Sequence, residues 1–114
     1  MSKLSSLKPM VRLSIMNPNT ESSSVFGRGI ASLCIGVRDT GSLNAAAKSM
    51  GMAYSKAWRI IKETEAALDV QLLNRDGAHG STLTDECVQI LDAYQAIEKA
   101  MQDQAGALYR EQIS

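Results

Sequence analysis

The stretch TGSLNAAAKSMGMAYSKAWRIIK, residues 40–62, decides the fold because it has the pattern of two short helices joined by a tight turn. Ser42 can cap the first helix by accepting a hydrogen bond from a backbone N–H group two or three residues on. Apolar residues then recur at helical spacing: Leu43, Ala46, Ala47 and Met50. Gly51 can take the left-handed backbone conformation that ends a helix. The sequence therefore predicts a helix, a turn, and a second helix that begins near Ala53.

The second helix, predicted over residues 53–68, has two different sides. At 100° per residue, its inward side is largely apolar: Ala53, Ala57, Ile60, Ile61, Thr64 and Leu68. Its opposite side is polar and basic: Ser55, Lys56, Arg59 and Lys62. Residues 48–62 contain three Lys, one Arg and no acidic residue, although the chain has a formal net charge of zero. This local concentration of positive charge favours a polyanionic partner over a solvated helix face.

The run GSLNAAAKSMGMAYSKAW, residues 41–58, resembles the winged helix-turn-helix domain of the molybdate-dependent transcriptional regulators, the ModE family. The resemblance extends over residues 25–105. The LysR-type regulators share the Gly-Ser-x-x-x-Ala-Ala core and are the second choice. Residues 54–58, YSKAW, favour the ModE family, because the LysR-type pattern usually has a Gln-Pro-x-Val-Ser-like run there. Two features depart from the ModE family: Ala53 replaces a usual Ser, and the wing at residues 76–80 is shorter and less glycine-rich.

The resemblance implies a mainly α fold with a small β wing, in which helix 53–68 enters the major groove of double-stranded DNA. Base edges would be read by Ser55, Lys56 and Arg59. Phosphates would be contacted by Ser42, Asn44, Lys48, Tyr54 and Lys62. The chain stops where the molybdate-binding domains of the ModE family would follow. We therefore expect a ModE-like, sequence-specific transcriptional regulator without the oxyanion-sensing domain and without a cofactor.

The rest of the chain fits the same single domain, which we assign to residues 1–114. Residues 1–24 are predicted to be a strand and a flexible entry, since VRLSI at 11–15 alternates apolar and polar side chains and would add to the wing. Residues 25–84 would form the helix-turn-helix and the wing, with a first helix over 29–39. The wing strands are predicted at 70–74 and 81–84. Arg75 would contact DNA from the wing, whereas His79 is better explained as a solvent-exposed loop histidine.

A long last helix is predicted over residues 85–105, capped by Thr84. Its apolar seam is longer than a small winged domain needs for its own core. We expect its first two turns to dock on helix 29–39 and the remainder to pair with a second copy of the chain. Beyond Gly106 we expect the helix to fray. The predicted homodimer interface is Cys87, Ile90, Tyr94, Ile97, Met101 and Leu108.

The two halves of the chain differ in charge. Residues 1–75 have ten basic residues against five acidic ones, whereas residues 76–114 have two against seven. Because DNA would repel an acidic segment, we expect the last helix to lie away from the duplex.

Cys34 and Cys87 are the only cysteines and His79 is the only histidine, which leaves no spacing suited to a zinc site. Both cysteines lie on apolar stripes and are predicted to be buried thiols, with a redox-sensing pair as the alternative.

Other classes of function fit the sequence less well. No nucleophile is paired with a base, so we predict that the chain is not an enzyme. No apolar run approaches the ~20 residues that span a bilayer, and nothing indicates export, so we expect a cytoplasmic protein. A winged domain that binds another protein rather than DNA remains the alternative, and weak salt dependence of nucleic-acid binding would favour it.

Overall fold

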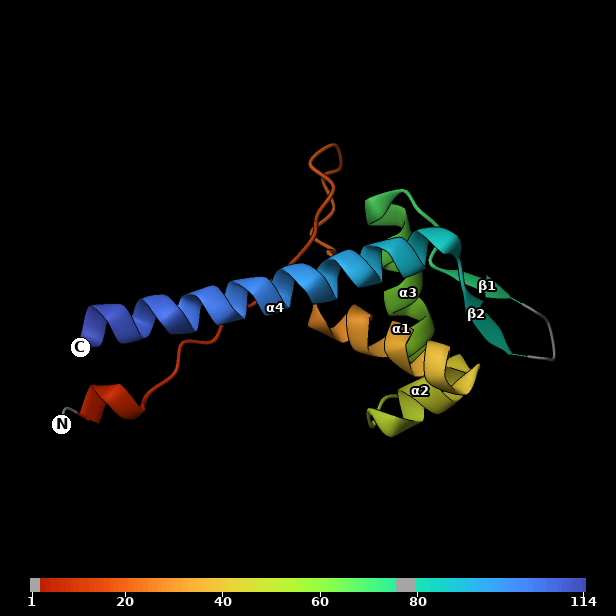
Figure 1. Cartoon of the computed structure of the whole chain (residues 1–114). Helices are drawn as coiled ribbons and strands as arrows, with labels where there is room; N and C mark the ends of the chain where they lie inside the picture. The colour runs from red at the N-terminus through yellow and green to blue at the C-terminus, as the bar shows by residue number, and fades with distance from the viewer. Residues whose placement is uncertain (1–2, 76–79) are drawn as a thin grey trace.

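The computed structural model describes residues 3–75 and 80–114 and shows the predicted fold, mainly helical with one small antiparallel hairpin. A short 3-10 helix, η1 (Lys3–Ser6), comes first. The elements that follow are α1 (Arg28–Thr40), α2 (Leu43–Ser49), α3 (Tyr54–Leu68), β1 (Leu73–Arg75), β2 (Ser81–Leu83) and α4 (Asp85–Ile113). Helices α1 to α3 and the hairpin make a compact body, and α4 projects from it as a long arm of the molecule (Figure 1).

The predicted helix ends are present. Ser42 Oγ accepts a hydrogen bond from Ala45 N at 3.1 Å, which caps α2. Thr84 Oγ1 accepts one from Cys87 N at 3.0 Å, which caps α4. Gly51 has a φ of 67° in the turn between α2 and α3, where a side chain would be strained. Ala53 caps α3 without a side-chain hydrogen bond, as expected where alanine replaces serine.

The core is built around α1. Its inward residues Leu33 and Val37 pack with Ile61 of α3, Leu72 before the hairpin and Leu91 of α4. The core also contains an edge-to-face contact between Phe26 and Tyr94, with ring centroids 5.6 Å apart. Thus α4 is joined to the body as far as Tyr94, beyond the first two turns that were predicted to dock.

The two cysteines lie together in this core. Cys34 and Cys87 are both 0% exposed, and their Sγ atoms are 3.5 Å apart. The hydrogen bond with Cys87 and burial both raise the pKa of the Cys34 thiol, so it stays protonated at neutral pH. The prediction of buried thiols is confirmed, and the contact joins α1 to α4.

Residues 11–15 do not extend the wing, so that prediction is wrong. Only Ile15 forms a bridge, and its partner is Phe26, with backbone hydrogen bonds of 2.9 and 2.8 Å. Phe26 precedes α1, whereas the hairpin contacts Gly41 just beyond the other end of this helix. A helix of 13 residues is about 20 Å long, which keeps the two segments apart.

Helix α4 does not fray at Gly106 but continues to Ile113, so the predicted boundary at residue 105 is also wrong. One glycine costs a helix only about 1 kcal/mol, and contacts with the start of the chain offset this cost. Residues 3–11, here called the N-terminal arm, lie along this part of α4, and the Tyr109 hydroxyl donates to Leu4 O at 2.6 Å.

The alternation of apolar and polar residues at 11–15 has another cause than a strand of the wing, because Leu13 and Ile15 pack on the core.

Two residues on the predicted inward faces are exposed instead. Met50 follows the last turn of α2 and is 39% exposed, and Ala53 lies outside α3 as its cap. Within residues 3–75 and 80–114, no helix is sufficiently long and apolar to span a bilayer.

Candidate DNA interface

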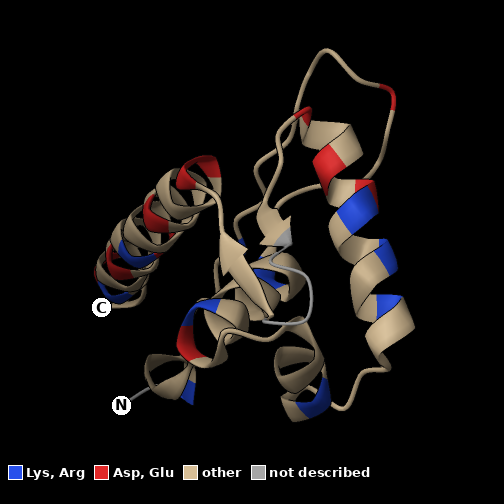
Figure 2. Ribbon diagram, turned by 90° about the vertical axis from the view of Figure 1, so that its right-hand side faces the viewer, with Lys and Arg blue, Asp and Glu red and all other residues tan. Residues whose placement is uncertain are grey.

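Small side chains determine how α2 and α3 cross. Ala46, Ala47 and Ala57 are at most 1% exposed, so these small side chains lie in the packed interior, Ala46 of them next to Gly36 of α1. The turn between them is closed by hydrogen bonds from Gly51 N to Lys48 O at 3.1 Å and from Met52 N to Ala47 O at 2.9 Å. The result is the predicted helix-turn-helix, with the start of α3 next to the end of α2 (Figure 2).

The structure brings the predicted base readers Ser55, Lys56 and Arg59 together on the exposed side of α3. Two of the predicted phosphate contacts, Tyr54 and Lys62, are exposed on the same helix. Figure 2 shows the basic residues on the half of α3 nearer to α2 and the acidic residues at its other end. Lys62 Nζ lies 3.4 Å from Glu65 Oε1 and 4.8 Å from the centre of the Trp58 ring. The positive surface is therefore centred on the first half of α3, with Lys62 at its border.

The predicted phosphate contacts of α2 lie beside this surface. Asn44 and Lys48 are exposed, whereas Ser42 is half-buried and its oxygen already accepts the capping bond. Ser42 can still donate its hydroxyl hydrogen. Arg75 is the last residue of β1, and His79 lies outside the described residues.

The hairpin that would form the wing is antiparallel and pairs Leu73 with Leu83, Asn74 with Thr82 and Arg75 with Ser81. Two further residues, Glu65 and Gly80, fix its position. Glu65 Oε2 accepts hydrogen bonds from Leu72 N at 2.7 Å and Leu73 N at 3.3 Å, which attaches β1 to α3.

Gly80 attaches the other strand to the end of α1. Ser81 N donates to Gly41 O at 2.9 Å, and Gly80 has a φ of 105°. A Cβ at Gly80 would collide with the Gly41 carbonyl, so only glycine fits. The sequence patterns indicate neither Glu65 nor Gly80. Glu65 binds backbone N–H groups, which no side-chain pattern reveals. Gly80 meets Gly41, which is distant along the chain.

The predicted dimer seam on α4 divides into two parts. Cys87 and Tyr94 are 0% and 3% exposed within their own chain, so they cannot contact a second copy, and we remove them from the predicted interface. Ile90 is half-buried against the same core. Ile97, Met101 and Leu108 lie beyond the body and are exposed. Cys87 and Tyr94 are buried because α4 packs on the core of its own chain over more than its first two turns.

The electrostatic arrangement agrees with the division of charge along the sequence. Helix α4 contains six acidic residues and two basic ones, and it lies on the far side of the body from the outer face of α3 (Figure 2). A duplex against α3 would therefore not meet α4 at close range. The described part of the chain contains no cluster of three His, Cys, Asp or Glu side chains placed to hold a metal ion.

Comparisons with known proteins address the family. No curated protein matches the sequence. Among solved structures, the chain is similar to the CbnR DNA-binding domain in the crystal structure of its complex with DNA. The two are 26% identical with a TM-score of 0.59, over 74% of this chain and 94% of that one.

The family profile described as "Bacterial regulatory helix-turn-helix protein, lysR family" matches residues 32–88, which is half of the chain. The second choice of the sequence analysis is thus better supported than the ModE family. This chain belongs to the lysR family of bacterial regulatory helix-turn-helix proteins.

Proposed function

We propose that this chain is the sequence-specific, double-stranded DNA-binding part of a transcriptional regulator and that it acts as a homodimer. The observation that carries the proposal is the exposed, uniformly basic first half of α3, next to α2 and with the hairpin fixed beside it. The lysR family match and the similarity to a domain bound to DNA support it.

In this proposal α3 lies in the major groove, whose width admits an α-helix. Arg59 is central on the exposed face, where its planar guanidinium can donate to two acceptors of one guanine. Ser55 and Lys56 read neighbouring bases. Lys48 at the end of α2 contacts the phosphate backbone, together with Ser42, Asn44, Tyr54, Lys62 and Arg75. These phosphate contacts set the register, and the base contacts set the sequence preference.

We expect substitution to separate the two roles. Arg59→Ala should cost about 1–3 kcal/mol per half-site on the preferred sequence and change binding to random DNA much less. Lys48→Ala should weaken binding to all sequences about equally and lower the salt slope by roughly 1 for each phosphate that the lysine no longer neutralises. Fluorescence anisotropy of both variants on specific and random duplexes across a salt series measures both effects.

A parallel loss of affinity on every duplex would show that the assignment of base reader and phosphate contact is incorrect. If neither variant shifts affinity by more than about 0.5 kcal/mol, both side chains are only solvated charges. Binding with weak salt dependence would favour the alternative, in which the winged domain binds a protein.

The homodimer rests on the exposed part of α4. Ile97 and Met101 are 44% and 37% exposed and lie on one side of a helix that projects from the body. Ile97→Glu should place an unpaired charge in the contact and raise the dimer dissociation constant by about tenfold or more. Sedimentation equilibrium tests this. A wild-type monomer at micromolar concentration, or an unchanged dissociation constant in the variant, would argue against pairing through α4.

A finer proposal concerns the family resemblance of the base-reading face. Residues 54–58, YSKAW, are ModE-like, although the chain as a whole has a lysR-type domain. We therefore propose that residues 54–58 give this chain a preferred half-site like that of the ModE family rather than that of the lysR family. Exchange of this run for the Gln-Pro-x-Val-Ser-like pattern should change the selected half-site.

A further inference from the structure

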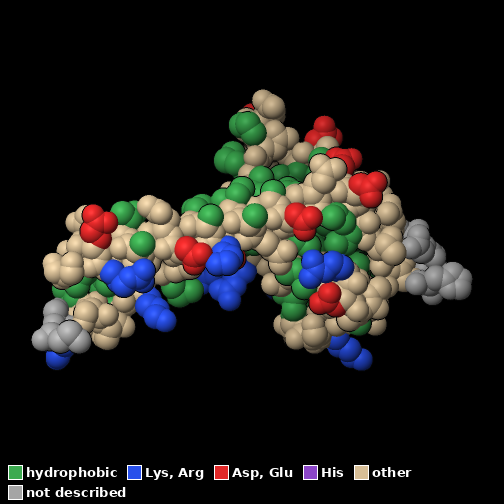
Figure 3. Space-filling view, viewed as in Figure 1, with side chains coloured by type: hydrophobic (Ala, Val, Ile, Leu, Met, Phe, Trp, Pro, Cys, Tyr) green, Lys and Arg blue, Asp and Glu red, His purple; other side chains and the backbone are tan. Residues whose placement is uncertain are grey.

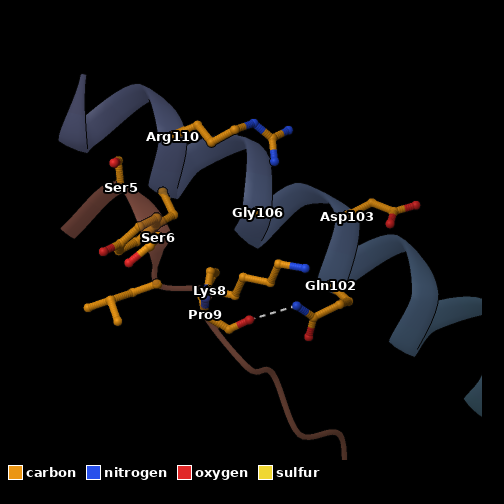
Figure 4. Close-up of a pocket in the computed structure, with 10 residues that line it drawn as sticks. Ser5, Ser6, Lys8, Pro9, Gln102, Asp103, Gly106 and Arg110 are labelled. Atoms are coloured by element: carbon orange, nitrogen blue, oxygen red, sulfur yellow. Dashed lines mark hydrogen bonds between the residues drawn. The ribbon is translucent and has the colours of Figure 1, made fainter. Parts of the chain in front are cut away.

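A groove of about 590 Å³ lies between the N-terminal arm and α4. It is lined by residues 8–12, by Arg28 at the start of α1 and by the middle of α4. Gln102 Nε2 donates to Pro9 O at 2.7 Å, and Gln102 Oε1 accepts from Val11 N at 3.0 Å, which fixes the arm as one wall. Figure 4 shows the first of these bonds. The groove has the size of a small-molecule site, since such sites measure about 300–1,000 Å³.

Three basic side chains line the groove without a carboxylate of their own: Lys8, Arg12 and Arg28. In the part of the chain that the structure describes, none of the three forms an ion pair. All three residues are exposed. Figure 3 shows Lys and Arg side chains gathered along the lower edge of α4, where the arm runs. The groove therefore presents positive hydrogen-bond donors that the rest of the protein leaves unused.

The acidic side chains of the groove already have partners in the protein. Asp103 Oδ2 accepts from Lys99 Nζ at 2.8 Å, so these two charges offset each other. Glu98 Oε2 accepts from the Tyr94 hydroxyl at 2.9 Å. Four basic and two acidic side chains line the groove in all, so its formal net charge is +2. This charge favours an anionic ligand.

Arg12 and Arg28 come together because of the bridge between Ile15 and Phe26. Arg12 precedes one partner of this bridge by three residues, and Arg28 follows the other by two. Burial and the bond to Glu98 raise the pKa of the Tyr94 hydroxyl, and the charges of Arg28 and Arg12 both oppose this rise. The two guanidinium groups therefore act on the same end of the groove.

This set of donors fits a phosphate group. Each guanidinium presents N–H donors in a planar fork that matches the oxygens of a phosphate or a carboxylate. A phosphate monoester has a charge of about −1.5 to −2 at neutral pH, whereas a single carboxylate has a charge of only −1. The phosphate thus matches the formal net charge of the groove better. The remaining space is lined by Gln95 and Glu98, whose side-chain oxygens can accept hydrogen bonds from hydroxyl groups.

We propose that the groove between the N-terminal arm and α4 binds a small phosphate monoester that carries hydroxyl groups. Lys8, Arg12 and Arg28 bind the phosphate, and Glu98 accepts from a hydroxyl group of the ligand. The arm follows α4, which lies on the far side of the body from the outer face of α3 (Figure 2). The site therefore stays open to a small molecule while α3 contacts DNA.

Isothermal titration calorimetry of the full chain with glucose 6-phosphate tests the proposal. The dissociation constant should be about 1 mM or lower, whereas glucose should give no measurable heat at about 10 mM. Arg28→Ala and Arg12→Ala should each raise the dissociation constant by about tenfold or more, because each removes charge-assisted bonds to the phosphate. Arg38→Ala is the matched control and should change it by less than about twofold. Arg38 belongs to the same helix as Arg28, but its side chain is 47% exposed and pairs with Asp39.

Each contrary outcome overturns a stated part of the proposal. The absence of measurable glucose 6-phosphate binding at about 10 mM overturns the site itself. Equal losses in Arg38→Ala and Arg28→Ala would show that only overall charge matters. Equally tight binding of succinate would overturn the assignment to a phosphate. If Arg28→Ala lowers the salt slope of DNA binding by roughly 1, the phosphate that Arg28 contacts belongs to DNA rather than to a small molecule.

Discussion

Replacing Glu65 by alanine is expected to lower the free energy of unfolding by about 2–5 kcal/mol, since two buried backbone N–H groups lose their acceptor at about 1–3 kcal/mol each. Glu65 Oε2 accepts from Leu72 N and Leu73 N, and these two residues are 0% and 2% exposed. The ion pair with Lys62 adds little because the Lys62 side chain is 59% exposed. Thermal unfolding followed by circular dichroism measures the loss, which should be roughly 10–20 °C in midpoint.

Glu65→Gln is the matched control. Its amide oxygen can accept the same two bonds, so we expect it to retain most of the stability, with a loss below about 1.5 kcal/mol. DNA affinity should follow the same order, because the bonds attach the hairpin to α3. Equal destabilisation by alanine and glutamine would indicate that the negative charge, rather than the accepted hydrogen bonds, is what matters at this position.

Gly36→Val is expected to cost about 3 kcal/mol or more, because α1 and α2 touch at this residue. A Cβ on Gly36 would lie 2.6 Å from Ala46 Cβ and 3.1 Å from Ala46 Cα, so the helices must move apart. Their separation would also disturb the helix-turn-helix, since Ala46 is within α2. Urea unfolding gives the change in stability.

Gly29→Val tests whether the effect belongs to this contact. Gly29 is in the same helix, but a Cβ there would meet nothing within 4 Å. We expect its stability to stay within about 0.5 kcal/mol of wild type. If both variants lose stability equally, the cost comes from valine in a helix, and the close crossing of α1 and α2 has little influence.

The helix-turn-helix could be predicted because its signals are local. Ser42 caps α2 three residues before its donor at Ala45, and Gly51 is both the sequence signal and the residue with positive φ. The hairpin and the cap at Thr84 also join residues that are close to each other along the chain. Such features depend on residues a few positions apart, so periodicity and turn chemistry reveal them.

The failures depend on contacts between distant residues. The apolar residues of α4 keep the same spacing along the whole helix. Their spacing therefore does not show that the helix leaves the core between Tyr94, which packs on Phe26, and Ile97, which is exposed. Likewise, Gln102 and Pro9 are 93 positions apart, so nothing near Gly106 predicts that the arm supports the helix there.

The placement of the candidate site residues on one helix face could be predicted, whereas the first choice of family was not supported. Side chains on one face of α3 follow from the helical repeat, and the structure places them together at the surface. Their contacts with DNA stay a prediction. The five residues YSKAW favoured the ModE family, whereas the lysR-family match covers residues 32–88, a much longer stretch than these five residues.

Selection of bound duplexes from a random DNA pool, with the full chain, tests the central claim most directly. The proposed function predicts enrichment of an inverted repeat whose half-sites are about 10 base pairs apart, or a multiple of this spacing, as a two-fold dimer requires. Affinity for the selected duplex should fall steeply as salt concentration rises. Failure to enrich any sequence, or nucleic-acid binding that hardly depends on salt, would contradict the claim that α3 reads DNA.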